Sequence, residues 1–267
     1  MKTKTLLLSL LCLVGITTAT AQSDVYCWKD GKAVKMENLD SLTFTAPASG
    51  NPQVDDARAL AEATTEDIGK IIGADGKIYA TKEAAEAAGI TAVAMIAYVG
   101  NDAETSSTYN HGLALALKDV AGYQQWCSKY IETCLSNQYS HVLGETGVIK
   151  GDMAGLANTD ALVYHSSHTH AAATAARNYQ YADGVAEGVH PVVTSAWFLP
   201  SAGQWEKMAT AVGGYAKLTT NAGLQTGRYW SSSEFNRFRA WDFSSQYGTW
   251  WDDGKAIGSL VRPCLAF

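Results

Sequence analysis

The sequence predicts an α+β fold, in which a domain of mixed short strands and two or three helices follows a small β-hairpin segment. Asp30-Gly31 and Asp75-Gly76 each lie between short apolar runs, which is typical of tight hairpins. Two later stretches carry apolar residues at helical spacing. The last stretch, Tyr229–Phe267, alternates short apolar segments with turn residues. A hydrophobic content of 47% is enough for a sizeable core.

The first 21 residues have the pattern of a secretory signal peptide. Lys2 and Lys4 precede the apolar run Leu6–Ile16, and Ala19-Thr20-Ala21 provides a small-residue cleavage site. The apolar run is too short to span a bilayer comfortably, and no later run is long enough. We therefore expect export and cleavage, without a lipid anchor, to the periplasm, the cell surface or the medium.

The mature chain is acidic. Without Lys2 and Lys4, 18 basic residues remain against 26 acidic residues, a net charge of −8. Nucleic acids and anionic membranes both select concentrated positive charge, so neither is expected as a partner. The spacing of the remaining cysteines does not form a dense disulfide framework, and buried free thiols are expected. These cysteines are Cys27, Cys127, Cys134 and Cys264.

The N-terminal part divides into a hairpin segment and a linker. The segment 22–46 has strands on both sides of Asp30-Gly31 and a further strand at Leu42–Phe44. Proline, glycine and serine then mark residues 47–62 as a linker. The main domain is expected to cover residues 63–267.

The main domain begins with a second hairpin and two strands. The hairpin turns at Asp75-Gly76, and Thr81 caps a short alanine-rich helix that ends at Gly89. Ile90–Val99 is apolar and β-branched, which predicts a strand buried on both faces. Gly112–Leu117 alternates large and small residues and is interpreted as a strand, with a helix as the alternative.

Helices are predicted in the middle of the domain. Tyr123–Asn137 repeats apolar residues every four positions, at Trp126, Tyr130 and Cys134, so it should face the core. Asp160–Tyr179 is interpreted as helical from its alanine content.

A third helix should follow a short strand at Trp197–Leu199. Ser201 and Gln204 form a capping-box pattern at its start. Trp205 and Met208 lie on its apolar face, and Gly213-Gly214 ends it.

The C-terminal stretch mixes large rings with diverse polar groups. Four of the eight tryptophans (Trp230, Trp241, Trp250 and Trp251) lie among Arg, Asp, Ser, Gln and Tyr residues. Tryptophan, tyrosine and arginine are enriched in interfaces, which favours a recognition surface. An ordinary sheet edge with some exposed rings is the alternative.

Four motifs carry a family resemblance. They are LPSAGQWEKM (Leu199–Met208), YWSSSE (Tyr229–Glu234), AW (Ala240-Trp241) and VRPCLAF (Val261–Phe267). In this order they resemble secreted bacterial proteins of the major-paralogous-domain family, which implies a C-type-lectin-like fold. Within that family the chain is similar to the variable proteins of diversity-generating retroelements, in which a fixed scaffold displays a diversified C-terminal surface.

The resemblance separates scaffold positions from display positions. Residues matching the scaffold are Tyr229, Trp230, Ser231, Ser232, Ser233, Glu234, Ala240, Trp241, Phe243, Gly248, Trp250, Lys255, Val261, Arg262 and Pro263. Residues at the display positions, which become the expected ligand-binding set, are Asn236, Arg237, Phe238, Arg239, Asp242, Ser244, Gln246, Tyr247, Thr249, Trp251, Asp252 and Asp253. Ser245 departs from the aromatic that is usual there, so its strand is expected to pack less tightly.

The histidine cluster His165, His168 and His170 offers a rival function, that of a metal-dependent hydrolase. On a helix His165 and His168 share a face while His170 points away from His168, so three-ligand convergence is poor. No catalytic triad or carboxylate pair stands out. We therefore expect a ligand-binding protein, adhesin- or receptor-like and without enzyme activity, cofactor or metal, that recognises a protein or glycan.

Two structural expectations follow. The segment Val261–Phe267 should be a buried strand paired near the start of the domain. Seven residues should be exposed on one contiguous surface, with Trp230, Trp241 and Phe243 buried beneath it. They are Arg237, Phe238, Arg239, Tyr247, Trp251, Asp252 and Asp253.

Overall fold

The computed structural model describes residues 25–29, 32–36, 57–104, 108–129, 151–164 and 168–267. The chain divides into two units, residues 1–52 and 53–267. The predicted signal peptide, the strand predicted at Leu42–Phe44 and most of the predicted linker lie outside the described residues.

The first unit contains the predicted hairpin. Strands β1 (Val25–Lys29) and β2 (Lys32–Met36) pair antiparallel, with Val25 opposite Met36. The two strands predicted on either side of Asp30-Gly31 are therefore confirmed, whereas the turn itself lies outside the described residues.

A six-stranded antiparallel sheet forms the base of the second unit, in the order β13-β7-β6-β4-β5-β3. Its strands are β3 (Arg58–Ala59), β4 (Ile71–Gly73), β5 (Lys77–Tyr79), β6 (Ala92–Val99), β7 (Gly112–Ala116) and β13 (Cys264–Ala266). The hairpin at Asp75-Gly76 is confirmed, because β4 and β5 pair across it. Strand β3 pairs with β5, so the sheet already includes residues of the predicted linker 47–62.

Both faces of this sheet are buried. Met95 and Leu115 belong to the hydrophobic cluster on one face, and Val93 and Ile96 to the cluster on the other. This confirms the prediction that Ile90–Val99 contains a strand buried on both faces.

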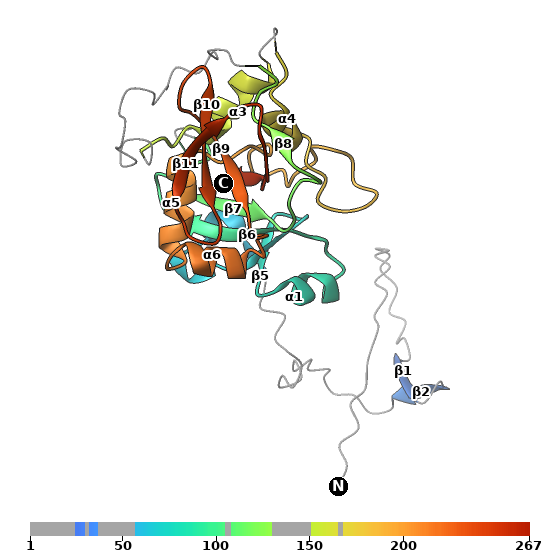
Figure 1. The fold of residues 1–267 in the computed structure, drawn as a ribbon. Helices are drawn as coiled ribbons and strands as arrows, with labels where there is room; N and C mark the ends of the chain where they lie inside the picture. The colour runs from blue at the N-terminus through green and yellow to red at the C-terminus, as the bar shows by residue number, and fades with distance from the viewer. Residues whose placement is uncertain (1–24, 30–31, 37–56, 105–107, 130–150, 165–167) are drawn as a thin grey trace. The chain divides into compact units, whose positions relative to one another are not determined.

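A second, three-stranded antiparallel sheet has the order β11-β10-β9 (orange to red in Figure 1). Its strands are β9 (Arg228–Glu234), β10 (Arg239–Ser244) and β11 (Trp250–Gly254). A two-stranded sheet lies nearby, since β12 (Gly258–Ser259) pairs with β8 (Gln124–Gln125).

Five α-helices are described: α1 (Lys82–Ala87), α3 (Gly155–Val163), α4 (Ala171–Arg177), α5 (Ala202–Ala211) and α6 (Tyr215–Asn221). The predicted caps are confirmed. Thr81 accepts a hydrogen bond from the Ala84 amide, and Ser201 and Gln204 form the capping box of α5. Trp205 of α5 joins the two larger sheets, because it packs with residues of both in one cluster. No helix among the described residues is long and apolar enough to cross a membrane.

The predicted helix over Tyr123–Asn137 is wrong in its described part. Gln124–Gln125 is strand β8, and residues 130–137 lie outside the described residues. The long-range pairing with β12 overrides the local apolar period. Trp126 is buried nonetheless, and its Nε1 donates a hydrogen bond to the carbonyl of Ser231.

The single helix predicted over Asp160–Tyr179 is two helices, α3 and α4. The chain leaves α3 at Tyr164, and the Thr169 carbonyl accepts a hydrogen bond from the Ser128 amide before α4 begins. The strand predicted at Trp197–Leu199 is reduced to one bridge between Phe198 and Cys264.

The segment Val261–Phe267 is buried, as predicted, and its strand β13 pairs with β7. The predicted partner near the start of the domain is not the one observed, because β7 is the fifth strand of this sheet along the chain. Strand β13 and the first strand, β3, lie at opposite ends of the sheet. Cys127 and Cys264 are buried free thiols, which confirms the prediction for these two. Cys134 and the side chain of Cys27 lie outside the described residues.

Candidate recognition surface

The turn between β9 and β10 presents the first group of predicted ligand-binding residues. Arg237, Phe238 and Arg239 are exposed, and Asn236 is half-buried. The Asn236 side-chain oxygen accepts hydrogen bonds from the Phe238 and Arg239 amides, which fixes the turn. The Arg237 guanidinium lies over the Phe238 ring at 4.4 Å, and Arg239 pairs with Asp252 at 2.8 Å.

The turn between β10 and β11 presents a second group. Gln246, Tyr247 and Thr249 are exposed there. Strand β10 separates the two turns, and five steps along it span about 17 Å. The two turns therefore lie at opposite ends of the sheet, and one contiguous surface that includes Tyr247 stays a prediction.

A third group lies on one face of the three-stranded sheet. Trp251 of β11 is 48% exposed, and the Arg228 guanidinium of β9 lies over its ring at 4.8 Å. Arg228 also pairs with Asp253, which like Asp252 is half-buried and not largely exposed as predicted. Sequence reasoning missed Arg228, although its position one residue before Tyr229 at the start of β9 is a signal that could have found it. Ser244 is half-buried at the end of β10.

Asp242 lies beneath this surface and not on it, which corrects its assignment to the ligand-binding set. Its side chain is fully buried below Arg228, whose Nη1 lies 3.7 Å from the Asp242 Oδ1. Burial and then the Asp253 carboxylate raise the pKa of Asp242 to about 8, against a lowering effect of Arg228.

Aromatic rings fill the space under the other face of the sheet. Phe243 is fully buried and its ring centroid lies 4.6 Å from Trp205 and 5.5 Å from Trp250. Trp241 is buried and packs edge-on against Phe235 at 5.2 Å. The predicted burial of Trp241 and Phe243 is confirmed, as is that of Trp230 in a separate cluster.

The serines of β9 hold a buried polar network. Ser233 Oγ donates to Asp152 Oδ2 at 2.6 Å, and Asn158 Nδ2 donates to the same oxygen at 3.1 Å. Burial raises the pKa of Asp152, whereas these donors lower it. Asp152 was not found from the sequence, since no local motif marks a carboxylate that is partnered from β9 and α3.

A buried ion pair lies where β9 and β11 end. Lys255, just after β11, pairs with Glu234 at the end of β9, and both side chains have no exposed area. The Lys255 ammonium also lies 4.8 Å from the centre of the Trp126 ring. Both charges match scaffold positions of the family resemblance.

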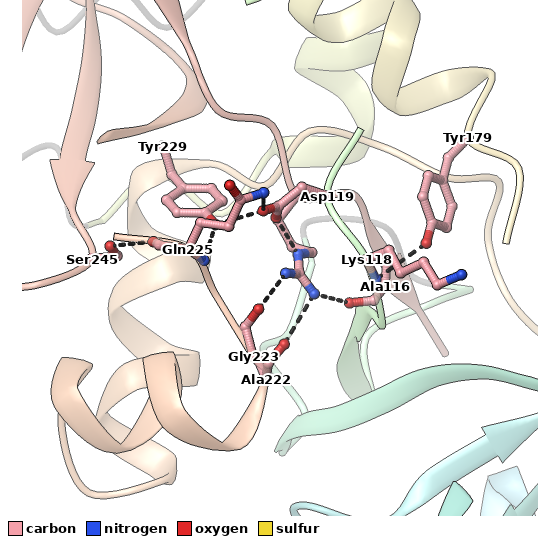
Figure 2. Close-up of polar contacts among 10 residues, drawn as sticks. Ala116, Lys118, Asp119, Tyr179, Ala222, Gly223, Gln225, Tyr229 and Ser245 are labelled. Atoms are coloured by element: carbon pink, nitrogen blue, oxygen red, sulfur yellow. Dashed lines mark hydrogen bonds and ion pairs between the residues drawn. The ribbon is translucent and has the colours of Figure 1, made fainter. Parts of the chain in front are cut away.

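A second buried ion pair ties the sheet to its surroundings. Figure 2 shows Asp119 beside Gln225 and Tyr229, and the carbonyls of Ala222 and Gly223 point toward the same guanidinium group as Asp119. This group is the guanidinium of Arg262, whose Nε donates a hydrogen bond to Asp119 at 2.6 Å. Its Nη atoms donate to the carbonyls of Ala116, Ala222 and Gly223.

Ser245 packs tightly, contrary to the expectation from its departure from the family pattern. Its side chain is buried, donates to the Gln225 carbonyl at 2.7 Å and accepts from the Gly227 amide at 3.1 Å. Hydrogen bonds to the preceding loop thus replace the packing of an aromatic ring.

The histidine cluster is only partly described. His165 lies outside the described residues, and His170 is buried with its ring 5.7 Å from that of Trp126. Within the described part of the chain, no three His, Cys, Asp or Glu side chains are grouped as metal ligands.

Comparison with known proteins shows a similarity to a solved structure. No family model and no curated protein matches the chain. A fimbrial protein from Bacteroides ovatus ATCC 8483, solved by crystallography, is similar to it with a TM-score of 0.52 at 16% sequence identity. The match covers 75% of this chain and 48% of the fimbrial protein, so the chain spans about half the length of that protein. The mixed α+β fold with antiparallel sheets is therefore shared, in outline, with a fimbrial protein.

Proposed function

We propose that this chain is an exported ligand-binding protein, adhesin- or receptor-like, whose C-terminal strands form a recognition surface for a protein or glycan. One observation carries the proposal. Every scaffold residue named above is buried except Gly248, and every display residue reaches the solvent except Asp242. Because the two sets alternate closely along the chain, the fold separates what holds the sheet from what faces outward.

This separation allows the surface to change without loss of the fold. Substitutions at exposed sites typically alter the free energy of unfolding by about 0.5 kcal/mol or less. Exposed tryptophan, tyrosine and arginine are also the residues that most often dominate binding energy. Trp251, Tyr247 and Arg237 supply all three types.

The finer proposal concerns family and origin. We propose that the domain is C-type-lectin-like and that its display residues are diversified by a retroelement. The motif resemblance supports this, and the fimbrial relative is compatible with a role on the bacterial surface. The proposed activity is binding and not catalysis.

The binding proposal is tested with a fourfold variant in which Arg237, Phe238, Tyr247 and Trp251 are replaced by alanine. Tyr164 and Val192, which are exposed elsewhere, provide a matched control when both are replaced by alanine. We expect both variants to melt near the wild-type temperature. On glycan arrays and panels of intact bacterial cells, the fourfold variant should lose the wild-type signals and the control should keep them. Equal binding by all three proteins would contradict the proposal.

The retroelement proposal is tested in the neighbouring DNA. We expect a near-copy of the segment encoding residues 229–267 that differs mainly at adenines and lies beside a reverse transcriptase. Absence of both would remove diversification from the proposal without affecting ligand binding.

A further inference from the structure

A pair of carboxylates lies directly under the Trp251 side of the surface. Asp242 Oδ1 is buried and accepts no hydrogen bond, and its charged neighbours are Arg228 of β9 and Asp253 of β11. Its other oxygen, Oδ2, accepts a hydrogen bond of 3.4 Å from Ser259 of β12. A buried carboxylate oxygen without a donor is costly when ionised. A proton on Oδ1 would remove that cost and donate to Asp253.

Asp242 and Asp253 share one neighbouring cation, Arg228. Arg228 pairs with Asp253, lies 3.7 Å from Asp242 and covers the ring of Trp251. With Asp242 neutral, one guanidinium balances one carboxylate. With Asp242 ionised, two carboxylates compete for it in a partly buried place where charges interact strongly.

We propose that Asp242 and Asp253 form a proton-binding site that controls the position of Arg228 and, through it, of Trp251 on the recognition surface. This deepens the proposed function, on which it rests for the role of Trp251 in binding. Loss of the proton draws Arg228 toward Asp242 and releases the Trp251 ring from the cation that covers it.

The other charges on the elements around Asp242 do not compete for this proton. On β10 and β11, Arg239 and Asp252 pair with each other. At the end of β9, Glu234 pairs with Lys255. Strands β8 and β12 carry Gln124, Gln125, Gly258 and Ser259, which do not titrate. The pKa of Asp242, raised to about 8, places the transition within a measurable pH range.

The test reads Trp251 itself and needs no ligand. The protein is labelled with 5-fluorotryptophan, and the resonance of Trp251 is assigned by its loss in Trp251→Phe. We expect this resonance to shift between pH 6 and pH 9.5 with a midpoint near 8. The resonances of buried rings far from the site, such as Trp197, should stay in place.

Variants of the charged residues test which groups cause the pH-dependent shift of the Trp251 resonance. Asp253→Asn removes a neighbouring negative charge and should move the midpoint to lower pH. Arg228→Gln removes the cation that links Asp242 to Trp251 and should abolish the shift. Asp242→Asn should abolish the shift, and Asp252→Asn, an acid on the same strand paired elsewhere, should leave it unchanged. A flat wild-type Trp251 resonance, a midpoint that Asp253→Asn does not lower, or a shift that persists in Arg228→Gln overturns the inference. Any of these results would leave the proposed ligand binding intact, because binding is measured separately on the arrays.

Discussion

Replacing Asp119 with alanine removes an acceptor that three side chains share. Arg262 Nε, Gln225 Nε2 and the Tyr229 hydroxyl donate to its carboxylate at 2.6, 2.8 and 2.9 Å. The side chains of Asp119 and Arg262 are 4% and 1% exposed. The change therefore leaves a buried cation without its counter-charge.

The expected loss follows from this burial. Removing one partner of a buried ion pair costs about 3–5 kcal/mol. Arg262 keeps three carbonyl acceptors, which favours the lower end for the cation. The Tyr229 hydroxyl still accepts from the Gln225 amide but loses the acceptor for its proton, which adds about 1 kcal/mol. We expect Asp119→Ala to lower the free energy of unfolding by about 4 kcal/mol.

Urea denaturation measures this loss, and Asp160→Ala provides the matched control. Asp160 pairs with Arg177 but is 47% exposed, so its loss should cost about 0–1 kcal/mol. If the two variants unfold within 1 kcal/mol of each other, the burial of the Asp119 pair does not have the energetic weight assigned to it.

Three further outcomes are expected. Trp241→Ala should lower the free energy of unfolding by about 3 kcal/mol or more, because the ring is buried. Trp251→Ala should change it by about 0.5 kcal/mol or less, because that ring is exposed. Equal losses in thermal melts would contradict the separation of core from surface. The pKa of Asp242 is raised from 3.8 to about 8 in the fold, so the folded protein binds the extra proton and stability should fall as pH rises from about 4 to 8. Asp242→Asn should flatten that part of the curve in denaturant titrations at several pH values, and an unchanged slope would refute the linkage. Deleting Pro263–Phe267 removes β13 and should abolish cooperative unfolding, which calorimetry would detect; an unchanged melting temperature would show that the strand is dispensable.

Local signals were enough to predict the parts of the fold that local physics determines. Asp75-Gly76 specifies a tight turn, and the Ser201–Gln204 capping box fixes the start of α5. The apolar run at Ile90–Val99 could belong only to a buried element. In each case neighbouring residues supply the turn, cap or hydrophobic pattern that the element requires.

Features set by distant partners could not be predicted in this way. Trp126 follows a helical period, yet β8 beside it pairs with β12, more than 130 residues later in the sequence. Asp242 has the polar character of a surface residue, and only its neighbours Arg228 and Asp253 explain its burial. The family resemblance separated positions that reach the solvent from positions that are buried, but it could not show that Asp242 is buried.

The buried pair of Glu234 and Lys255 brackets, within the sequence, the whole stretch that carries the display residues. A one-residue slip of either strand would turn one of these charges to the other face and leave its partner buried alone. That error costs about 3–5 kcal/mol, whatever residues occupy the two turns between them. The pair therefore favours one register of these strands, and turns of very different sequence would be compatible with that same register.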